Sequence, residues 1–413
     1  MRKVLLSIVF ILTSYIGFSQ SVKISADRLF DGSEMHQNWS LIIEGNVIVA
    51  VGPSAKLSAD STIDLGNATL MPGMIEGHSH VLLYPYNQTD WNDQVLKESP
   101  ALRAIRGSKA AEANLRAGFT TIRDLGSEGA GYADVAVKQS IELGINIGPR
   151  MLVAGPAIVA TGSYGPKGFH DGVDVPLGAQ EADGDRVIQV VREQIGKGAD
   201  FIKVYADYRW GPEGQAMPTF SLEELELMVK TAASSDRDVV AHASTDEGIR
   251  RAVMAGVKTI EHGTAGTLET FQLMKEKGVG LCPTLAATYT ITQYRTEWDG
   301  SEMNEPEAIK EKRDMFRRAL ESGVRIVAGG DVGVFPHGQN ALELELMVQY
   351  GMKPLQVLQS VTSVNAAIFG LHQLGQLKEG YLADVIAVNG NPTEDIKSLY
   401  HPVMIIKDGK AID

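Results

Sequence analysis

Residues 70–80 read LMPGMIEGHSH, an apolar run that ends in two histidines. The apolar residues at 70–75 predict a buried strand. Side chains at positions i and i+2 of a strand share one face, so the imidazoles of His78 and His80 are expected to point the same way. Two imidazoles on one side suit a metal ion, although a His-x-His pair also occurs in ordinary solvated loops.

Short apolar runs recur downstream, often after a helical stretch that ends in glycine, a residue that fits the left-handed position closing a helix. The strand candidates begin near Leu70, Phe119, Arg150, Phe201, Val239, Lys258, Val279 and Arg325. Eight strands alternating with helices favour an α/β fold, a (β/α)8 TIM barrel over residues 72–373. A doubly wound open sheet is the alternative, weakened because no glycine-rich phosphate loop follows the first strand.

Both ends of the remaining chain are rich in strands. Residues 40–43 and 47–52 flank a turn, and residues 382–388 and 403–406 precede the hairpin turn at Asp408-Gly409. The two ends could pair into one small β-sandwich domain, formed by residues 21–71 and 374–413.

Residues 1–20 predict a signal peptide. Arg2 and Lys3 precede an apolar run at 4–18, and Ser19 and Gln20 follow it. An uncleaved anchor is the alternative, but the run is short for a membrane span. Cys282 is the only cysteine, so neither an intrachain disulfide nor a lipid anchor after the apolar run is expected. A periplasmic or secreted protein, free of the membrane after cleavage, is expected.

The charge of the chain limits its partners. The 413 residues carry a formal net charge of -13, spread along the sequence. Nucleic acids and anionic membranes reward a basic face, so neither is expected as a partner. A small molecule or a dipeptide fits better, and a homo-oligomer stays open.

Three further strand candidates end in residues that bind metals. His242, His262 and Asp331 each stand at the carboxyl end of a strand, where barrel enzymes place their catalytic groups. With His78 and His80 they would form a ring of nitrogen and oxygen ligands suited to Zn²⁺. A single histidine at a strand end is more often structural, but a set in this register is hard to obtain from packing alone.

Lys203 interrupts an apolar run at 201–205 that should be buried in a parallel sheet. A buried ammonium is costly and tends to lose its proton. It could pair with an acid, for example Asp207 or Glu261. Alternatively, the neutral amine could react with CO₂ and form a carbamate, an anionic ligand able to bridge two metal ions.

Together these segments resemble the amidohydrolase superfamily, in its imidazolonepropionase-like and Xaa-Pro dipeptidase-like branches. The matching segments are residues 71–80, 201–204, His242, 261–263, 329–331 and 380–384. The resemblance covers nearly all of the chain after residue 20, and it implies a barrel with a β-sandwich and two divalent metal ions, with zinc favoured.

The resemblance also implies roles for individual residues. His78 and His80 would hold the more buried metal, carboxylated Lys203 would bridge, and His242 and His262 would hold the second metal. Asp331 would bind the first metal and shuttle the proton as the catalytic residue. Gly330 departs from many relatives, which carry Thr or Ser before this aspartate.

The implied activity is hydrolysis of a C–N amide bond by a metal-bridging hydroxide, with Asp331 as general base and then acid. The expected substrate is a dipeptide, Xaa-Pro or related, or an N-acyl amino acid. Tyr205, His170 and His337 are the expected donors to its carboxylate, although each could be an ordinary loop or core residue. Residues 288–298 could form a lid or a surface loop. The alternatives are a cyclic-amide or lactone hydrolase and a catalytically inactive metal-binding protein.

Overall fold

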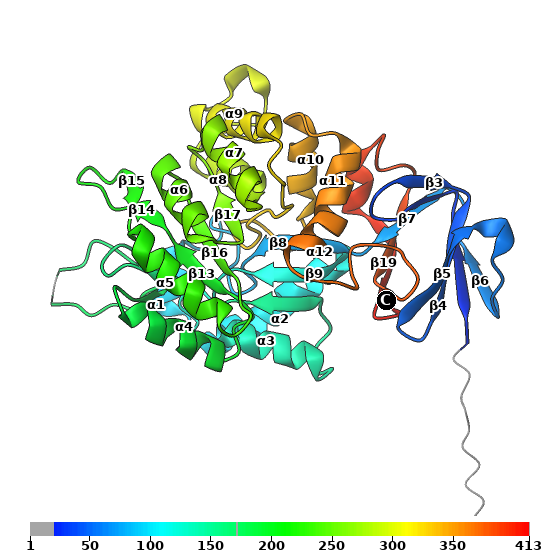
Figure 1. Ribbon diagram of the computed structural model, residues 1–413, viewed down its shortest axis with the longest axis horizontal. Helices are drawn as coiled ribbons and strands as arrows, with labels where there is room; N and C mark the ends of the chain where they lie inside the picture. Colours follow the sequence, from blue (N-terminus) through cyan, green and yellow to red (C-terminus); the bar gives the residue numbers. More distant parts are fainter. Residues whose placement is uncertain (1–19, 171, 413) are drawn as a thin grey trace, which may run out of the picture.

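The computed structural model describes residues 20–170 and 172–412, so the predicted signal peptide lies outside the described residues except for Gln20. The molecule is elongated, with a larger part of strands and helices beside a smaller part built from strands (Figure 1). Both ends of the described chain belong to the smaller part. The α/β class predicted from the sequence is confirmed.

Two parallel sheets form the larger part. One has the order β10-β9-β8, and the other has the order β12-β11-β13-β16-β17-β18. Their strands are β8 (Met74–Ser79), β9 (Phe119–Asp124), β10 (Arg150–Val153), β11 (Ile158–Val159), β12 (Gln180–Glu181), β13 (Ile202–Tyr205), β16 (Val239–Ala243), β17 (Thr259–His262) and β18 (Gly280–Cys282). The hairpin β14 (Asp207–Arg209) and β15 (Ala216–Pro218) extends from the end of β13.

Hydrogen bonds connect the two parallel sheets at both edges. Asp200 donates its backbone N–H to the Val153 carbonyl, 2.8 Å away. At the other edge, residues 326–332 bridge Leu281 of β18 and Ser79 of β8. The strand predicted near Arg325 is reduced to these bridges. The Ala328 carbonyl still accepts the Gly77 N–H of β8, but the Asn365 side chain accepts the Ala328 N–H, which a longer ladder would use.

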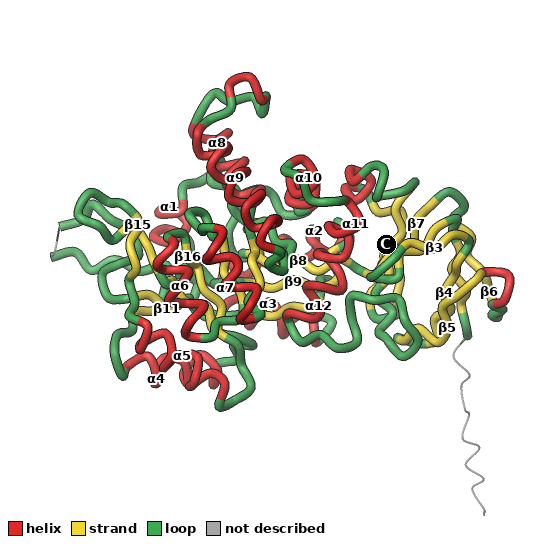
Figure 2. The backbone as a smooth tube through the Cα atoms, turned by 45° about the horizontal axis from the view of Figure 1, so that its top comes forward, coloured by secondary structure: helices red, strands yellow, loops and turns green. Residues whose placement is uncertain are grey.

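Helices cover the parallel strands (Figure 2). The α-helices of the larger part are α1 (Trp91–Lys97), α2 (Pro100–Arg116), α3 (Ala133–Glu142), α4 (Arg186–Gly196), α5 (Leu222–Ala233), α6 (Asp246–Ala255), α7 (Leu268–Lys277), α8 (Leu285–Arg295), α9 (Glu307–Ser322), α10 (Ala341–Gln349), α11 (Pro354–Gln359) and α12 (Asn365–Ile368). Elsewhere the chain forms the short 3₁₀ helices η1 (Ser54–Lys56), η2 (Glu302–Asn304) and η4 (Ile396–Tyr400), and the π-helix η3 (Ser360–Val364) joins α11 to α12. Within the described ranges, no helix has the length and hydropathy needed to cross a membrane.

The helix boundaries follow the sequence signals. Ser221 accepts a hydrogen bond from the Glu224 N–H, and the Glu224 carboxylate accepts one from the Ser221 N–H, which completes a capping box. Gly256, Gly278 and Gly323 end α6, α7 and α9 with φ values of 94°, 72° and 72°. These are left-handed conformations that glycine adopts without a steric penalty.

The smaller part contains two sheets with the orders β5-β4-β1-β6 and β21-β20-β19-β7-β2-β3. The strands are β1 (Val22–Ser25), β2 (Arg28–Phe30), β3 (Met35–Gln37), β4 (Trp39–Glu44), β5 (Val47–Pro53), β6 (Ser61–Asp64), β7 (Ala68–Pro72), β19 (Val385–Asn389), β20 (Pro402–Lys407) and β21 (Lys410–Ala411). Antiparallel pairing of β7 with β19 joins the two chain ends. Ile24 and Leu41 of one sheet share a buried cluster with Leu70 and Val385 of the other.

Gly409 provides a test of how closely the two chain ends pack. Its φ is 73°, and an added Cβ would collide with the carbonyl oxygen of Gly45. Gly390 has a φ of 72° but no atom within 4 Å of an added Cβ, so it is a matched control. Gly390→Ala should cost about 1 kcal/mol of unfolding free energy through backbone conformation alone. Gly409→Ala should cost a further ~1–3 kcal/mol through the collision.

Urea unfolding of both variants measures these costs. Equal destabilisation by the two substitutions would contradict the close approach of Gly409 to Gly45.

Candidate metal centre

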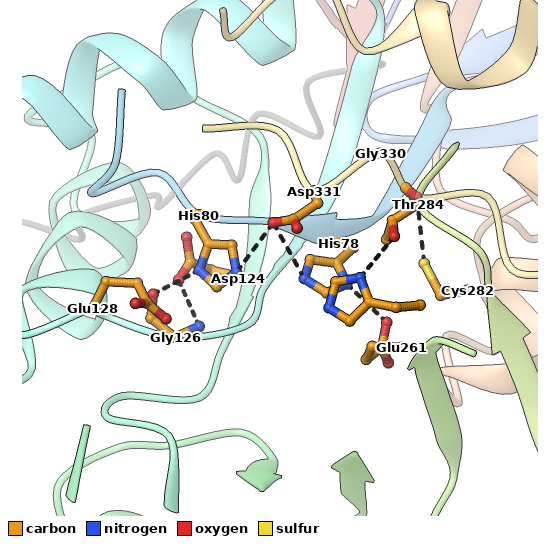
Figure 3. A network of polar contacts seen from close by, with 12 residues as sticks. His78, His80, Asp124, Gly126, Glu128, Glu261, Cys282, Thr284, Gly330 and Asp331 are labelled. Atoms are coloured by element: carbon orange, nitrogen blue, oxygen red, sulfur yellow. Dashed lines mark hydrogen bonds and ion pairs between the residues drawn. The ribbon is translucent and has the colours of Figure 1, made fainter. Parts of the chain in front are cut away.

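Three predicted ligands, His78, His80 and Asp331, meet at the carboxyl ends of the parallel strands (Figure 3), and His262 lies beside them. The Nε2 atoms of His78 and His80 lie 3.5 Å and 3.4 Å from Oδ1 of Asp331. The ring centroids of His78 and His262 are 5.2 Å apart. One ligand atom from each of His78, His262 and Asp331 falls within a group no wider than 4.8 Å. This spacing suits a shared metal ion.

Three histidines are oriented through their Nδ1 atoms. His78 Nδ1 lies 2.9 Å from a carboxylate oxygen of Glu261, and His80 Nδ1 donates to the Gly126 carbonyl at 3.0 Å. His262 Nδ1 lies 2.8 Å from the Thr284 hydroxyl. Contacts of this kind fix the ring and its tautomer, which leaves Nε2 available to a metal.

His242 is held differently. Its ring stacks on Tyr205, with centroids 4.5 Å apart and planes 17° apart. Its Nε2 is 3.7 Å from Asp207 Oδ1, too far for a hydrogen bond. The centroids of His242 and His262 are 4.6 Å apart, so His242 borders the other ligands.

Burial keeps the imidazoles of His78, His242 and His262 neutral by lowering their pKa values. It lowers the pKa of His242 to about 3, with a further contribution from the charge of Lys203. Burial is also the main reason that the pKa values of His78 and His262 fall well below the usual range. Neutral imidazole is the form that binds a metal ion.

Lys203 is 1% exposed on β13, and burial lowers the pKa of its amine. Among the residues that the structure describes, no hydrogen bond or ion pair involves its Nζ, which lies 5.5 Å from the centroid of the Tyr205 ring. The two acids that could have neutralised it are engaged elsewhere. Asp207 accepts from Ser244 and Thr245, and Glu261 bonds His78 and Arg123.

Two buried carboxylates that the sequence did not single out as site residues support this centre. Glu261 accepts from Arg123 Nη2 at 2.9 Å while it contacts His78. Glu76 accepts from the N–H groups of His78 and Gly330, both at 2.9 Å. Burial raises the pKa of Glu76 to about 7. The available signal for Glu76 was a charged residue inside an apolar strand, two positions before His78.

Backbone conformations with positive φ concentrate at the site. His262, Thr284 and Asp331 have φ values of 74°, 50° and 63°. Such conformations are costly for residues other than glycine and persist where the surroundings impose them. Gly330, the departure from many relatives, has little free space, because an added Cβ would lie 3.1 Å from the Phe335 ring. A side chain at position 330 would therefore require the Phe335 ring to shift by a few tenths of an ångström.

The three residues predicted to contact the substrate, Tyr205, His337 and His170, lie in different surroundings. Tyr205 lies in the site, stacked on His242. His337 uses Nε2 to reach the Leu83 carbonyl at 3.1 Å, and its Nδ1 lies 3.3 Å from the Asn114 amide. His170 is exposed on a loop, where its Nδ1 accepts from the Gly172 N–H at 3.1 Å.

The segment predicted as a lid or a surface loop at 288–298 is mostly helical, because α8 runs from Leu285 to Arg295. Its threonines bond back to helix carbonyls. Thr290 and Thr292 donate their hydroxyls to the carbonyls of Ala286 and Thr288, at 2.8 Å and 2.7 Å. These bonds satisfy the hydroxyls within the helix, a pattern that the sequence alone did not show.

Histidines and an aspartate gathered at the ends of parallel strands, with helices covering those strands, define an α/β protein with a candidate metal-binding site. The chain belongs to the Amidohydrolase family, whose sequence model matches residues 69–412. The resemblance inferred from the sequence is thereby confirmed.

Named relatives agree with this membership. The chain is 32% identical over 408 residues to the ochratoxinase of Aspergillus niger, covering 90% of this chain and 81% of that protein. It is 23% identical over 412 residues to the imidazolonepropionase of Deinococcus radiodurans, covering 93% and 94%. A solved Xaa-Pro dipeptidase with bound methionine superimposes with a TM-score of 0.84 at 32% identity, covering 95% and 100%. The family and these relatives identify the chain as a hydrolase.

Thr284 should influence metal affinity through His262. Thr284→Val keeps the branched shape but removes the hydroxyl beside His262 Nδ1, so the ring loses its orienting contact. Metal affinity should fall about 10–100-fold, as is typical when such a contact is lost. Titration with a competing chelator measures the affinity.

Thr290→Val is the control, because the Thr290 hydroxyl bonds only carbonyls of α8. If Thr284→Val and Thr290→Val bind metal equally well, Thr284 does not orient His262.

Proposed function

We propose that this chain is an exported amidohydrolase that uses two divalent metal ions to hydrolyse the C–N amide bond of a dipeptide or an N-acyl amino acid. The observation that carries the proposal is the convergence of His78, His80 and His262 on Asp331, with each Nδ1 held by another group. Export is proposed from the basic residues and apolar run within residues 1–20.

The donor set fits a pair of zinc ions. His78, His80 and Asp331 would hold one ion, His242 and His262 would hold the other, and Lys203 would bridge them as a carbamate derived from CO₂. Lys203 supports this role because it is buried without a partner among the described residues. When bound, such ions lower the pKa of a water molecule and polarise a carbonyl group.

Asp331 is the proposed proton carrier. Burial raises the pKa of its carboxyl group above the ordinary value, and a carboxylate in hydrogen-bond reach of the attacking water can act as a general base. It would accept a proton from the attacking water and return that proton to the leaving amine. Glu76 would position Asp331, because it binds the N–H of the preceding Gly330.

For the architecture, we propose a closed (β/α)8 barrel over residues 72–373 and a composite β-sandwich from residues 21–71 and 374–413. The bridges from Ile326 to Leu281 and from Val332 to Ser79 support closure. The buried cluster shared by Ile24 and Val385 supports the sandwich.

A cyclic-amide or lactone hydrolase is the second candidate, favoured by the similarity to imidazolonepropionase. An inactive metal-binding protein would not need the full ligand set. A dipeptide is preferred because the Xaa-Pro dipeptidase covers nearly the whole chain at higher identity than the imidazolonepropionase.

Lys203→Ala should lose metal and activity. A short carboxylate such as formate should partly restore both, since it can occupy the gap left by the carbamate. Elemental analysis should find about two ions per wild-type chain, because the ligands are too many for one tetrahedral ion.

Lys312→Ala is the comparison, because Lys312 is also buried and donates to the His262 carbonyl at 3.0 Å. Formate should not restore that variant. A Lys203→Ala enzyme that keeps its metal and its rate without formate would exclude the bridge.

Asp331→Asn should lower kcat by about 10²–10⁴-fold with a smaller change in KM, because it removes the proton acceptor and leaves most of the pocket in place. Asp236→Asn is the matched control, since exposed Asp236 shares the left-handed conformation with a φ of 59°. Steady-state kinetics and metal content are measured for both. A near wild-type kcat in Asp331→Asn would rule out this role.

A panel of dipeptides, their C-terminally amidated partners, lactones and cyclic amides tests the function itself. Dipeptides should be hydrolysed, and amidation should lower kcat/KM by about 10²-fold, because donors to the lost carboxylate would stay unpaired. If only lactones or cyclic amides are hydrolysed, the chain is a cyclic-amide or lactone hydrolase, the second candidate.

A further inference from the structure

Glu128 is a buried carboxylate beside the metal centre that the proposed chemistry does not use. It lies in the loop after β9, is 3% exposed and has a φ of 47°. A Cβ added to Gly126 would lie 3.4 Å from Glu128 Oε1 and 3.5 Å from His80 Cε1, so this carboxylate borders the ligand His80 (Figure 3). A strained backbone that directs a charge toward a site suggests a functional role.

The Glu128 carboxylate has no ion-pair partner among the described residues, although its charge and that of the buried Arg103 guanidinium attract each other. Its Oε2 accepts from Trp91 Nε1 and the Tyr164 hydroxyl, both at 2.8 Å, and its Oε1 faces only the Tyr205 hydroxyl, at 3.4 Å. Arg103 binds the backbone carbonyl of Glu128 rather than its carboxylate. In residues 20–170 and 172–412, no lysine or arginine forms an ion pair with this carboxylate. One oxygen therefore retains capacity for a strong donor.

Aromatic rings surround this carboxylate. Tyr164 is the centre of the group, with ring centroids 5.3 Å from Trp91, 4.8 Å from Tyr205 and 4.8 Å from Tyr208. Tyr205 stacks in turn on His242, which connects the group to the metal ligands. We call Trp91, Glu128, Tyr164, Tyr205 and Tyr208 the Glu128 box.

We propose that the Glu128 box binds an ammonium group of the substrate beside the scissile amide. A carboxylate with an open oxygen offers a charge-assisted hydrogen bond, and aromatic faces attract a desolvated cation. A carboxylate of the substrate would be repelled at this position, so in this proposal Tyr205, whose hydroxyl donates to Glu128, does not also serve as the donor to that carboxylate. The inference rests on the proposed function and narrows its substrate class to amides that carry an amine.

The amine could come from two sources. The α-ammonium of a dipeptide is separated from the scissile carbonyl by a single carbon atom, so it must lie next to the metal centre, as the box does. A side-chain ammonium of a basic residue is the other source. The position of Glu128 beside His80 favours the α-ammonium.

Matched pairs of substrates test the proposal. The holoenzyme is assayed with dipeptides that have a free or an acetylated N-terminus, with lysine or norleucine as side chains. The wild type should prefer the free amine by about 10–100-fold in kcat/KM, the range for a hydrogen bond to a charged group. Glu128→Gln should lose most of this preference, since the amide keeps the shape but not the charge. Metal content should not change.

Glu98→Gln is the control variant, because Glu98 also accepts from a tyrosine hydroxyl, that of Tyr84 at 2.7 Å, but lies in an ion pair with Arg106. It should retain the preference. If Glu128→Gln does not fold, Glu128→Asp, which keeps the charge at a shorter reach, should weaken the preference without abolishing it.

Calorimetry with a ketomethylene dipeptide analogue, free or N-acetylated, separates this inference from the proposed function. Binding that depends on the free amine and on Glu128 would support the box even if no amide is hydrolysed. A preference for lysine over norleucine that needs Glu128, without an effect of acetylation, would assign the ammonium to a side chain. Equal binding and hydrolysis of free and acetylated ligands without a lysine preference, or an unchanged preference in Glu128→Gln, would overturn the proposal.

Discussion

The buried carboxylate of Glu261 links the strands on which the candidate site depends. It is fully buried on β17 and contacts His78 of β8 and Arg123 of β9. Removing one member of such a buried group leaves an uncompensated charge, typically at a cost of about 3–5 kcal/mol. The contact with His78 also orients that imidazole. Glu261 therefore both balances the buried charge of Arg123 and positions a candidate metal ligand.

Glu76 positions the backbone of the site, as Glu261 positions the His78 imidazole. Its carboxyl group bonds the N–H groups of His78 and Gly330, and the Asn340 amide. The strand with the histidine pair and the turn with Asp331 are therefore held by one group. This arrangement supports the positive φ of Asp331, which local sequence preferences would not maintain.

The side chains around the site differ in their charge. Burial keeps the imidazoles of His78, His242 and His262 neutral, and buried Lys203 has no hydrogen-bond or ion-pair partner in the described chain. Glu128 contributes an anion on the side of His80, enclosed by aromatic rings. The proposed metal ligands and the proposed ammonium site at Glu128 therefore lie side by side. This proximity would connect the chemistry at the metal centre to the choice of substrate.

The sequence by itself determined the α/β class, because strand alternation and helix-ending glycines are local properties of the chain. Through the resemblance of its motifs to known members it also indicated the family, and it marked His78, His80, His242, His262 and Asp331 as candidate ligands. It also marked Lys203, since a charge inside an apolar run is visible locally. Only the tertiary structure decided which groups aim these ligands. His78 and Glu261 are 183 residues apart, and Trp91 and Glu128 are 37 apart. The tertiary structure also has isolated bridges where a strand was predicted near Arg325, and it places His337 in contact with the Leu83 carbonyl and the Asn114 amide. Such partners depend on how distant segments pack, which no local pattern encodes.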